Sequence, residues 1–327
     1  MVINAVWLFF LEALWNLMGQ FKQQLQDGCR KALWPVARGL RSLLTPPTPP
    51  IEFGWHRIEG GPAVGAHVML PRNTLIADAI TAGDYDKKIL EVVEVLVGKD
   101  DTCFDIGGHY GCYTLSLAKL ASEGQVHTFE PVPAHAERIK EAAKKSAFQH
   151  VQVHQVAMAG QNGEMMLQFA EAEGSDDSMA FLDAYGGVDT QAAHEHYRSF
   201  ARTSVQAVTL DSLSGDLPSV QFIKIDAEGA EAAILGAGHN LISSNKPRLL
   251  IELHGIYEAL ACAEILCTLN YQAILLTDQK TTLPILWASR DDAAAVQAIE
   301  KVLGHEPTVM FASLSEPSSS ADCVPDA

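Results

Sequence analysis

Short apolar strands and amphipathic helices alternate from Thr102 to Ala312, and this alternation limits the fold more than any other feature of the chain. A strand followed by a helix and another strand favours parallel pairing, with helices on both faces of one sheet. The pattern therefore predicts an α/β fold with a doubly wound, mainly parallel sheet. The expected strands are Thr102–Ile106, Gln125–Glu130, Val151–Val156, Val220–Asp226, Arg248–His254, Tyr271–Leu276 and Thr308–Ala312. The expected helices are Thr114–Ser122, Pro133–Phe148, Glu231–Ser243, Tyr257–Leu269 and Asp291–Leu303.

Two segments interrupt this alternation. A hairpin is expected around Gly163–Ala170, and a polar stretch from Gly174 to Thr203 precedes a strand at Val205–Thr209. So long an insertion in a compact domain is typical of a lid or a substrate loop. Its candidate substrate contacts are Asp176, Asp177, Tyr185, Tyr197 and Arg198.

The two ends of the chain differ from the region between them. Residues 1–44 predict an apolar helical extension with one narrow polar stripe. This extension has three alternative placements. It packs on its own domain or on a twin subunit, it lies in a membrane interface, or it spans the membrane at the cost of burying Glu12. The Pro-rich residues 45–50 predict a stiff linker, residues 51–314 the catalytic domain, and residues 315–327 a disordered tail.

Charge and cysteine content narrow the function classes. The formal net charge is −17, while residues 1–50 are basic, so the remainder is strongly acidic. An acidic body without a basic, aromatic stripe does not favour nucleic acid as a partner. The six cysteines include no C-x-x-C pair, which indicates reduced thiols and a cytoplasmic protein. A small or neutral substrate is the expected ligand.

The segment FDIGGHYG, residues 104–111, joins the first expected strand of the sheet to its helix. Such a loop lies at the carboxyl ends of the strands, where open α/β sheets bind ligands. Gly107 and Gly111 permit the turn, and Glu130 ends the next strand, where an acid can accept hydrogen bonds from a ribose diol. The alternative is a tight turn without a ligand.

His109 bears on which nucleoside this loop binds. In the dinucleotide fingerprint the corresponding position is a glycine, which lets the backbone approach a pyrophosphate. An imidazole would crowd a pyrophosphate, whereas S-adenosylmethionine has no phosphates. The sequence thus favours S-adenosylmethionine over a nicotinamide dinucleotide.

A second stretch, VQFIKIDAEGAEAAILGAG at residues 220–238, brings three acids to the same edge of the sheet. Asp226 and Glu228 are candidate site residues, while Glu231 fits the first turn of the following helix. Glu252 and His254 end the next strand two residues apart, so they are expected to point to the same side. His254 is the first candidate for a general base, because its unperturbed pKa of about 6.5 suits neutral pH.

The chain resembles the FkbM-type S-adenosylmethionine-dependent methyltransferases. The resemblance rests on FDIGGHYGCYT, TFEPVP, VTLDSL, FIKIDAEGAEAAILGAG and LLIELHG, in order and spacing over about residues 80–277. It implies a Rossmann-like methyltransferase fold with a seven-stranded sheet, and usually O-methylation of a hydroxyl on a sugar or secondary metabolite. The chain departs from the family pattern at Gly108, where alanine is usual, and at His109, where asparagine is usual.

Carried over residue by residue, the resemblance implies two groups of site residues. The catalytic group is His254, Asp226 and Glu228, and the cofactor-binding group is Asp105, Gly107, Gly108, His109, Gly111, Glu130 and Ala157. No metal is expected. The alternative is a divalent ion bound by Asp226 and neighbouring carboxylates. His194 and His196 lack a third ligand for zinc.

Three function hypotheses follow. The first is methyl transfer from S-adenosylmethionine to a hydroxyl on a sugar, glycan, lipid or metabolite, with peripheral membrane contact through residues 1–44 as an option. The second is a nicotinamide-dependent oxidoreductase, which His109 disfavours. The third is a methyltransferase-like scaffold that acts through its N-terminal helix.

Overall fold

The computed structural model describes residues 52–170, 180–185, 200–213, 219–276 and 284–311. The chain divides into two units, Met1–Pro49 and Pro50–Ala327, and all described residues belong to the second. The expected helical extension at 1–44, the linker at 45–50 and the tail at 315–327 therefore lie outside the described residues. Among the helices that the structure describes, none has the length and apolar character needed to cross a membrane.

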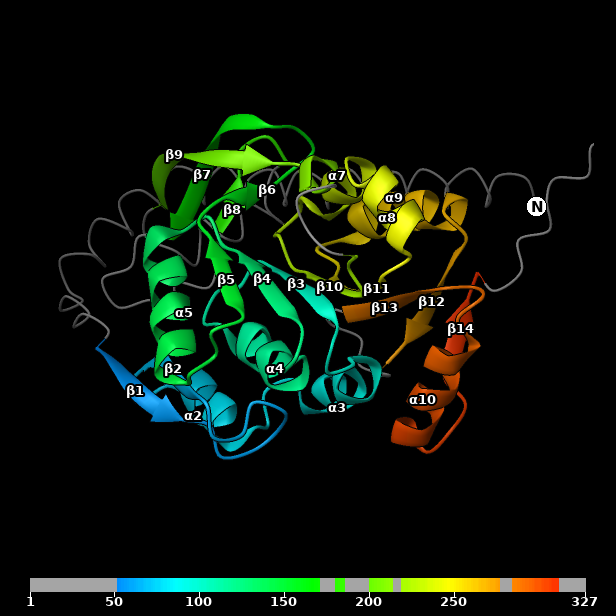
Figure 1. Cartoon of the computed structure of the whole chain (residues 1–327). Helices are drawn as coiled ribbons and strands as arrows, with labels where there is room; N and C mark the ends of the chain where they lie inside the picture. Colours follow the sequence, from blue (N-terminus) through cyan, green and yellow to red (C-terminus); the bar gives the residue numbers. More distant parts are fainter. Residues whose placement is uncertain (1–51, 171–179, 186–199, 214–218, 277–283, 312–327) are drawn as a thin grey trace, which may run out of the picture. The chain divides into compact units, whose positions relative to one another are not determined.

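Eight strands of the described residues form the main sheet, in the order β14-β12-β13-β11-β10-β3-β4-β5 (Figure 1). The five strands from β11 to β5 are mutually parallel, and β13 joins antiparallel to both β11 and β12. The carboxyl ends of the parallel strands thus meet at one edge. The strands are β3 Thr102–Ile106, β4 Gln125–Phe129, β5 Val151–His154, β10 Phe222–Ile225, β11 Arg248–Glu252, β12 Tyr271–Leu275, β13 Pro284–Ser289 and β14 Thr308–Met310.

The expected α/β class with a mainly parallel sheet is confirmed, whereas the expected count of seven strands is wrong. The strand that sequence reasoning missed is β13, which lies between β11 and β12. It begins at Pro284 and is a short apolar run buried on both faces. It pairs antiparallel with both neighbours, so it falls outside the succession of strand, helix and parallel strand from which the other strands were predicted.

Helices cover both faces of the sheet (Figure 1). Alternate residues of each strand point to opposite faces, so Ile223 and Ile225 belong to one core cluster and Phe222 to the other. The first cluster includes α7, α8 and α9, and the second includes α3, α4 and α10. The helices are α3 Lys87–Leu96, α4 Cys112–Leu120, α5 Pro133–Lys145, α7 Glu231–Gly236, α8 His239–Asn245, α9 Ile256–Thr268 and α10 Ala293–Leu303.

The single helix expected at Glu231–Ser243 is instead two short helices, α7 and α8, which break at Ala237 and Gly238. A side chain at Gly238 would collide with the buried Leu210, which lies in the short 3-10 helix η1 (Leu210–Leu213). Asp211 of the same turn accepts the N–H groups of Asn240 and Leu241 at the start of α8. Tertiary contacts therefore end the first helix where its amino-acid pattern would continue.

A four-stranded sheet, in the order β6-β9-β7-β8, lies beyond the carboxyl edge of the main sheet (Figure 1). The expected hairpin strand is β7, and part of the expected insertion forms β8 and the start of β9. Residues 174–179 and 186–199 of the insertion, including His194 and His196, lie outside the described residues. The strands are β6 Ala157–Met158, β7 Gly163–Ala170, β8 Ala180–Leu182 and β9 Phe200–Val208.

A hairpin and a short helix precede the main sheet and were not expected from the sequence. Strands β1 and β2 pair antiparallel, and Ser146 at the end of α5 accepts the N–H of His67 at 2.8 Å. Leu70 and Ile80 are buried with Tyr110, which lies in the glycine loop. This subdomain therefore supports the loop from outside. Its elements are β1 Phe53–Arg57, β2 His67–Pro71 and α2 Leu75–Ala82.

Candidate active site

The loop after β3 passes close to the end of β10. Gly107 has a φ of +80°, and a Cβ there would collide with the backbone oxygen of Asp226. Only glycine accepts both conditions without displacement of the backbone. Gly111, with a φ of +84°, then begins α4. The glycines therefore set the distance between the loop and the acidic strand end.

Glu130 lies just past the end of β4 and is held by the loop itself. Its carboxylate accepts the N–H of His109 and the N–H of Val132, each at 2.9 Å, and Nδ1 of His135 is 3.6 Å from it. Burial by itself raises the pKa of Glu130, but His135 and the two N–H donors lower it below its usual value. Glu130 is thus a fixed carboxylate, and a carboxylate retains free lone pairs for further donors.

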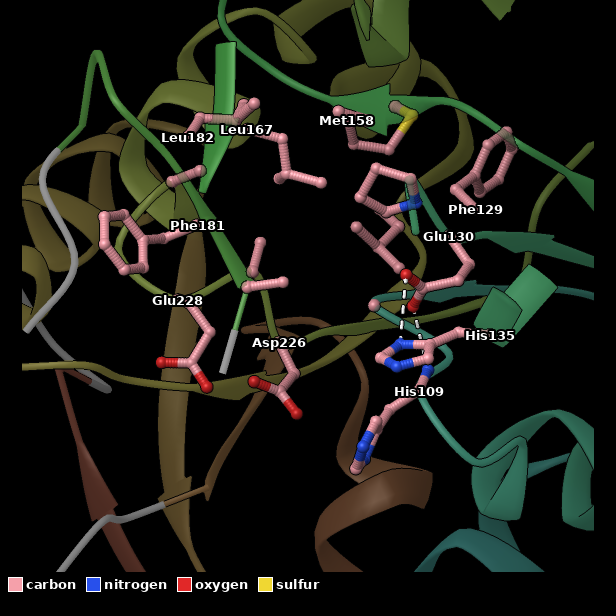
Figure 2. Close-up of a pocket in the computed structure, with 17 residues that line it drawn as sticks. His109, Phe129, Glu130, His135, Met158, Leu167, Phe181, Leu182, Asp226 and Glu228 are labelled. Atoms are coloured by element: carbon pink, nitrogen blue, oxygen red, sulfur yellow. Dashed lines mark hydrogen bonds and ion pairs between the residues drawn. The ribbon is translucent and has the colours of Figure 1, made fainter. Parts of the chain in front are cut away.

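The pocket beside Glu130 has apolar walls (Figure 2). Phe129 comes from the main sheet, and Met158, Leu167 and Leu182 come from the four-stranded sheet. This sheet therefore covers the crevice. A flat, largely apolar base would fill such a slot with its ribose near Glu130. The residues that line the pocket are Ile106, Gly107, His109, Phe129, Glu130, Pro131, His135, Ala157, Met158, Leu167, Ala180, Phe181, Leu182, Asp226, Ala227, Glu228 and Ala230.

Lys224 joins the loop to the acidic edge. It lies in β10 with its side chain only 6% exposed, and its Nζ donates to the backbone oxygen of Gly107 at 2.9 Å and to Asp226 at 3.2 Å. Asp105, its register partner in β3, lies 3.7 Å from the same Nζ. Burial acts to lower the pKa of Lys224, but Asp226 and Asp105 together raise it above its usual value. The lysine is therefore a permanent cation.

Asp226 and Glu228 form the opposite end of the pocket from His135 (Figure 2). Their side chains are 28% and 22% exposed, so both carboxylates reach the pocket. Glu228 has a φ of +50°, a conformation that is uncommon for non-glycine residues. Burial raises the pKa of Glu228 to about 7, and Asp226 and Glu231 add to the rise.

His254 lies between these two acids and a third. Its Nε2 is 3.6 Å from Asp226 and 3.5 Å from Glu228, and its Nδ1 is 2.9 Å from Glu231. Glu231 is fully buried, and its carboxylate accepts the N–H groups of Ala227 and Gly229. Glu231 therefore orders the strand end and fixes the imidazole at the same time, which goes beyond the helix-capping role expected for it.

The expectation that His254 keeps its ordinary pKa is wrong. Burial by itself lowers the pKa of an imidazole, but the hydrogen bond to Glu231 and the carboxylates of Glu228 and Asp226 raise the pKa of His254 to about 9. At neutral pH the ring is therefore protonated in this structure. A protonated imidazole cannot accept a proton, so the reason given for His254 as a general base does not hold.

The other residues expected from the sequence occupy different positions. Gly107, His109, Glu130 and Ala157 line the pocket, as do Asp226 and Glu228. Asp105 is fully buried below the loop, where it accepts the hydroxyl of Thr114 at 2.6 Å. Gly108 packs against Thr128 and Ile139, and Gly111 packs against Ile139. Asp105, Gly108 and Gly111 therefore support the loop from behind.

Sequence reasoning missed several residues that shape the site. His135 lies five positions after Glu130 in the first turn of α5, and that short spacing was the only signal for it. Lys224 is a charged residue inside an apolar strand, and the sequence alone assigns it no role. Tyr185, expected to contact substrate, instead accepts the N–H of Gly160 through its hydroxyl at 2.8 Å. Asp176, Asp177, Tyr197 and Arg198 lie outside the described residues.

The site suits a nucleoside with a cationic tail. The pocket has apolar walls, then the fixed carboxylate of Glu130, and then the acids Asp226 and Glu228. S-adenosylmethionine has an adenine, a ribose diol, and a sulfonium and an ammonium group in the same order. These residues therefore fit the cofactor expected from the sequence.

A model of the methyltransferase FkbM domain matches residues 105–273 of the chain. The match begins at the buried aspartate of β3 and ends in β12, so it includes the glycine loop, Glu130, the acidic strand end and His254. It covers just over half of the chain.

The chain is also similar to individual proteins. It is 24% identical over 162 residues to the 2-O-methyltransferase NoeI of Sinorhizobium fredii (strain NBRC 101917 / NGR234), a match that covers 48% of this chain and 65% of that protein. Its structure is similar to a methyltransferase FkbM from Methylobacillus flagellatus KT, with a TM-score of 0.42, 14% identity, and coverage of 64% of this chain and 53% of that one. It is also similar to SMU.1697c from Streptococcus mutans, a putative methyltransferase in complex with SAH, with a TM-score of 0.36, 13% identity, and coverage of 60% and 92%.

Proposed function

The chain belongs to the FkbM methyltransferase family, and from that premise we propose that it transfers a methyl group from S-adenosylmethionine to a hydroxyl oxygen. The observation that supports this most directly is that the cofactor half-site, which is the Gly107 loop, touches the acceptor half-site at the backbone of Asp226. A methyl donor held at the loop would lie beside the acids that face an acceptor. Proximity of this kind supplies much of the rate of a displacement reaction.

The residues of the chain divide the work between binding and proton transfer. Glu130 would hold the ribose, and the apolar walls would hold the adenine and exclude water. When bound, S-adenosylmethionine supplies a methyl group already activated by its sulfonium. Asp226 and Glu228 are the exposed carboxylates of the edge, so they are better placed than the protonated His254 to receive the hydroxyl proton.

The acceptor class is a hydroxyl on a sugar, glycan, lipid or secondary metabolite. The name of the similar protein NoeI, a 2-O-methyltransferase, supports transfer to oxygen. The strongly acidic chain supports a small or neutral acceptor, because it would repel nucleic acid.

Two measurements test this function. Calorimetric titration of the full chain is expected to show binding of S-adenosylhomocysteine and none of NAD, and Glu130→Gln should weaken that binding by about 10- to 100-fold through loss of a charged acceptor. Mass spectrometry of extracts from cells with and without the protein should then reveal a compound that becomes lighter by one methyl group when the protein is absent. Binding of NAD instead would replace this proposal with the oxidoreductase. Cofactor binding with no methylated product would favour the scaffold.

The unusual His109 is expected to be replaceable. Its φ of +48° suits asparagine, and the contact to Glu130 comes from the backbone N–H, which Asn would keep. His109→Asn should therefore leave the affinity for S-adenosylhomocysteine within about threefold of wild type, as measured by the same titration. A loss beyond about tenfold would instead assign the imidazole, which packs on Tyr110, a direct contact with the cofactor.

A further inference from the structure

We infer that Asp226, Glu228 and His254 form a binding site for one divalent transition-metal ion such as Mn²⁺. The ligand atoms would be one carboxylate oxygen each from Asp226 and Glu228, and Nε2 of His254, which would release its proton to solvent when the ion binds. These three atoms lie within 4.8 Å of one another. The role of the ion in catalysis rests on the proposed function, whereas the site itself does not.

The distances between the three side chains suit a shared ion. Nε2 of His254 is 3.6 Å from Oδ1 of Asp226 and 3.5 Å from Oε2 of Glu228. These separations are long for hydrogen bonds. Bonds from a transition metal to imidazole nitrogen or carboxylate oxygen are about 2.0–2.2 Å long, so neighbouring ligands of one ion lie about 3.0–3.5 Å apart. The two distances from Nε2 are therefore close to those between ligands around one ion.

The orientation of His254 is an independent indication. Its side chain is only 8% exposed, and Nδ1 is bonded to the buried Glu231, so Nε2 is directed between the two pocket acids. A carboxylate behind a histidine is the usual arrangement for a metal-ligating imidazole, because it fixes the ring and the tautomer. Glu231 is itself held by backbone N–H groups of Ala227 and Gly229. The imidazole is thus ordered before any ligand binds.

The excess of negative charge around this position also favours binding of a cation. Among the described residues, carboxylates close to the site outnumber basic groups, and S-adenosylmethionine at neutral pH contributes a net charge of only about +1. A divalent ion would offset the remaining negative charge. The acids are Asp86, Asp105, Asp226, Glu228, Glu231 and Glu252, and the basic groups are Lys224 and His254.

The ligand set indicates which metal and which acceptor. One imidazole with two carboxylates suits Mn²⁺, Fe²⁺ or Zn²⁺ better than Ca²⁺ or Mg²⁺, which prefer oxygen ligands alone. Three protein ligands leave open positions on the ion. If the proposed function holds, those positions would take oxygen atoms of the acceptor, and a vicinal diol would occupy two of them.

The test measures Mn²⁺ binding to the chelator-treated full chain by the loss of the free-ion paramagnetic resonance signal. We expect one ion per chain, with the affinity reduced at least about tenfold in Asp226→Asn and in His254→Asn. The His254→Asn side chain keeps an N–H donor near the position of Nδ1 for Glu231 but has no atom at Nε2. Glu164→Gln, a surface acid on β7, is the matched control and should bind like wild type. Circular dichroism and chemical unfolding of each variant verify that it is folded.

The outcomes separate this inference from the proposed function. Stoichiometric binding that both site variants weaken supports the metal site even if no methyl transfer is ever detected. No binding by folded wild-type protein, or binding that neither site variant changes, overturns the site. Methyl transfer that proceeds unchanged in the chelator-treated chain, with no Mn²⁺ bound, overturns the role of the ion in catalysis and leaves the proposed function intact.

Discussion

Gly107→Ala is expected to abolish binding of S-adenosylhomocysteine and to lower the free energy of unfolding by about 3 kcal/mol. The new methyl group would meet the backbone oxygen of Asp226, which has no flexible side chain to move aside. The positive φ adds strain, because alanine rarely adopts this conformation. Relief of the collision would push the loop away from β10 and separate the two half-sites.

Calorimetric titration and chemical unfolding measure the two effects of Gly107→Ala. Gly304→Ala is the matched control, because Gly304 has a φ of +75° and a Cβ added there would meet nothing within 4 Å. The control should lose only about 1–2 kcal/mol and should bind S-adenosylhomocysteine normally. Equal losses in the two variants would show that backbone strain alone, rather than contact with Asp226, accounts for the effect.

Glu231→Ala is expected to be the most destabilising change at the acidic edge, with a loss of about 3–5 kcal/mol in the free energy of unfolding. The substitution would leave the N–H groups of Ala227 and Gly229 and the imidazole of His254 without their buried acceptor. Glu258→Ala is the control. Glu258 also accepts a backbone N–H, from Ala232 at 3.2 Å, but it is only partly buried and should cost about 1 kcal/mol.

A second substitution separates the positioning role of Glu231 from its structural role. Glu231→Gln keeps the size and one acceptor oxygen, so the chain should fold and bind S-adenosylhomocysteine. Its affinity for Mn²⁺ should nevertheless fall by about 10- to 100-fold, because a neutral amide is a weaker partner for a metal-bound imidazole. Unchanged Mn²⁺ affinity in the folded variant would restrict Glu231 to a structural role.

The sequence predicted the framework of the site because the framework depends on local rules. Parallel strands bring their carboxyl ends together, so the order of the elements was enough to place Gly107, Glu130 and Asp226 at one edge. The spacing of two between Glu252 and His254 likewise indicated a polar strand end. These inferences needed only strand periodicity and the succession of strands and helices.

The parts that failed depend on contacts between distant residues. The pKa of His254 is set by Glu231, Glu228 and Asp226, and no single-sequence pattern reports how deeply those groups are buried. The break between α7 and α8 depends on Leu210, which precedes it by more than twenty residues. Strand β13 was missed because it pairs antiparallel with both neighbours, so it does not follow the strand–helix–strand succession of parallel strands.

Lys224 has a consequence for how an inhibitor of this protein should be designed. Its ammonium group donates hydrogen bonds to the loop at Gly107 and to Asp226, so it holds the two half-sites at a fixed distance from each other. A compound that links a nucleoside to an acceptor mimic would meet a fixed span rather than two independent subsites. The length of its linker would therefore decide its potency more sharply than the strength of either half, as expected when effective concentration depends on geometry.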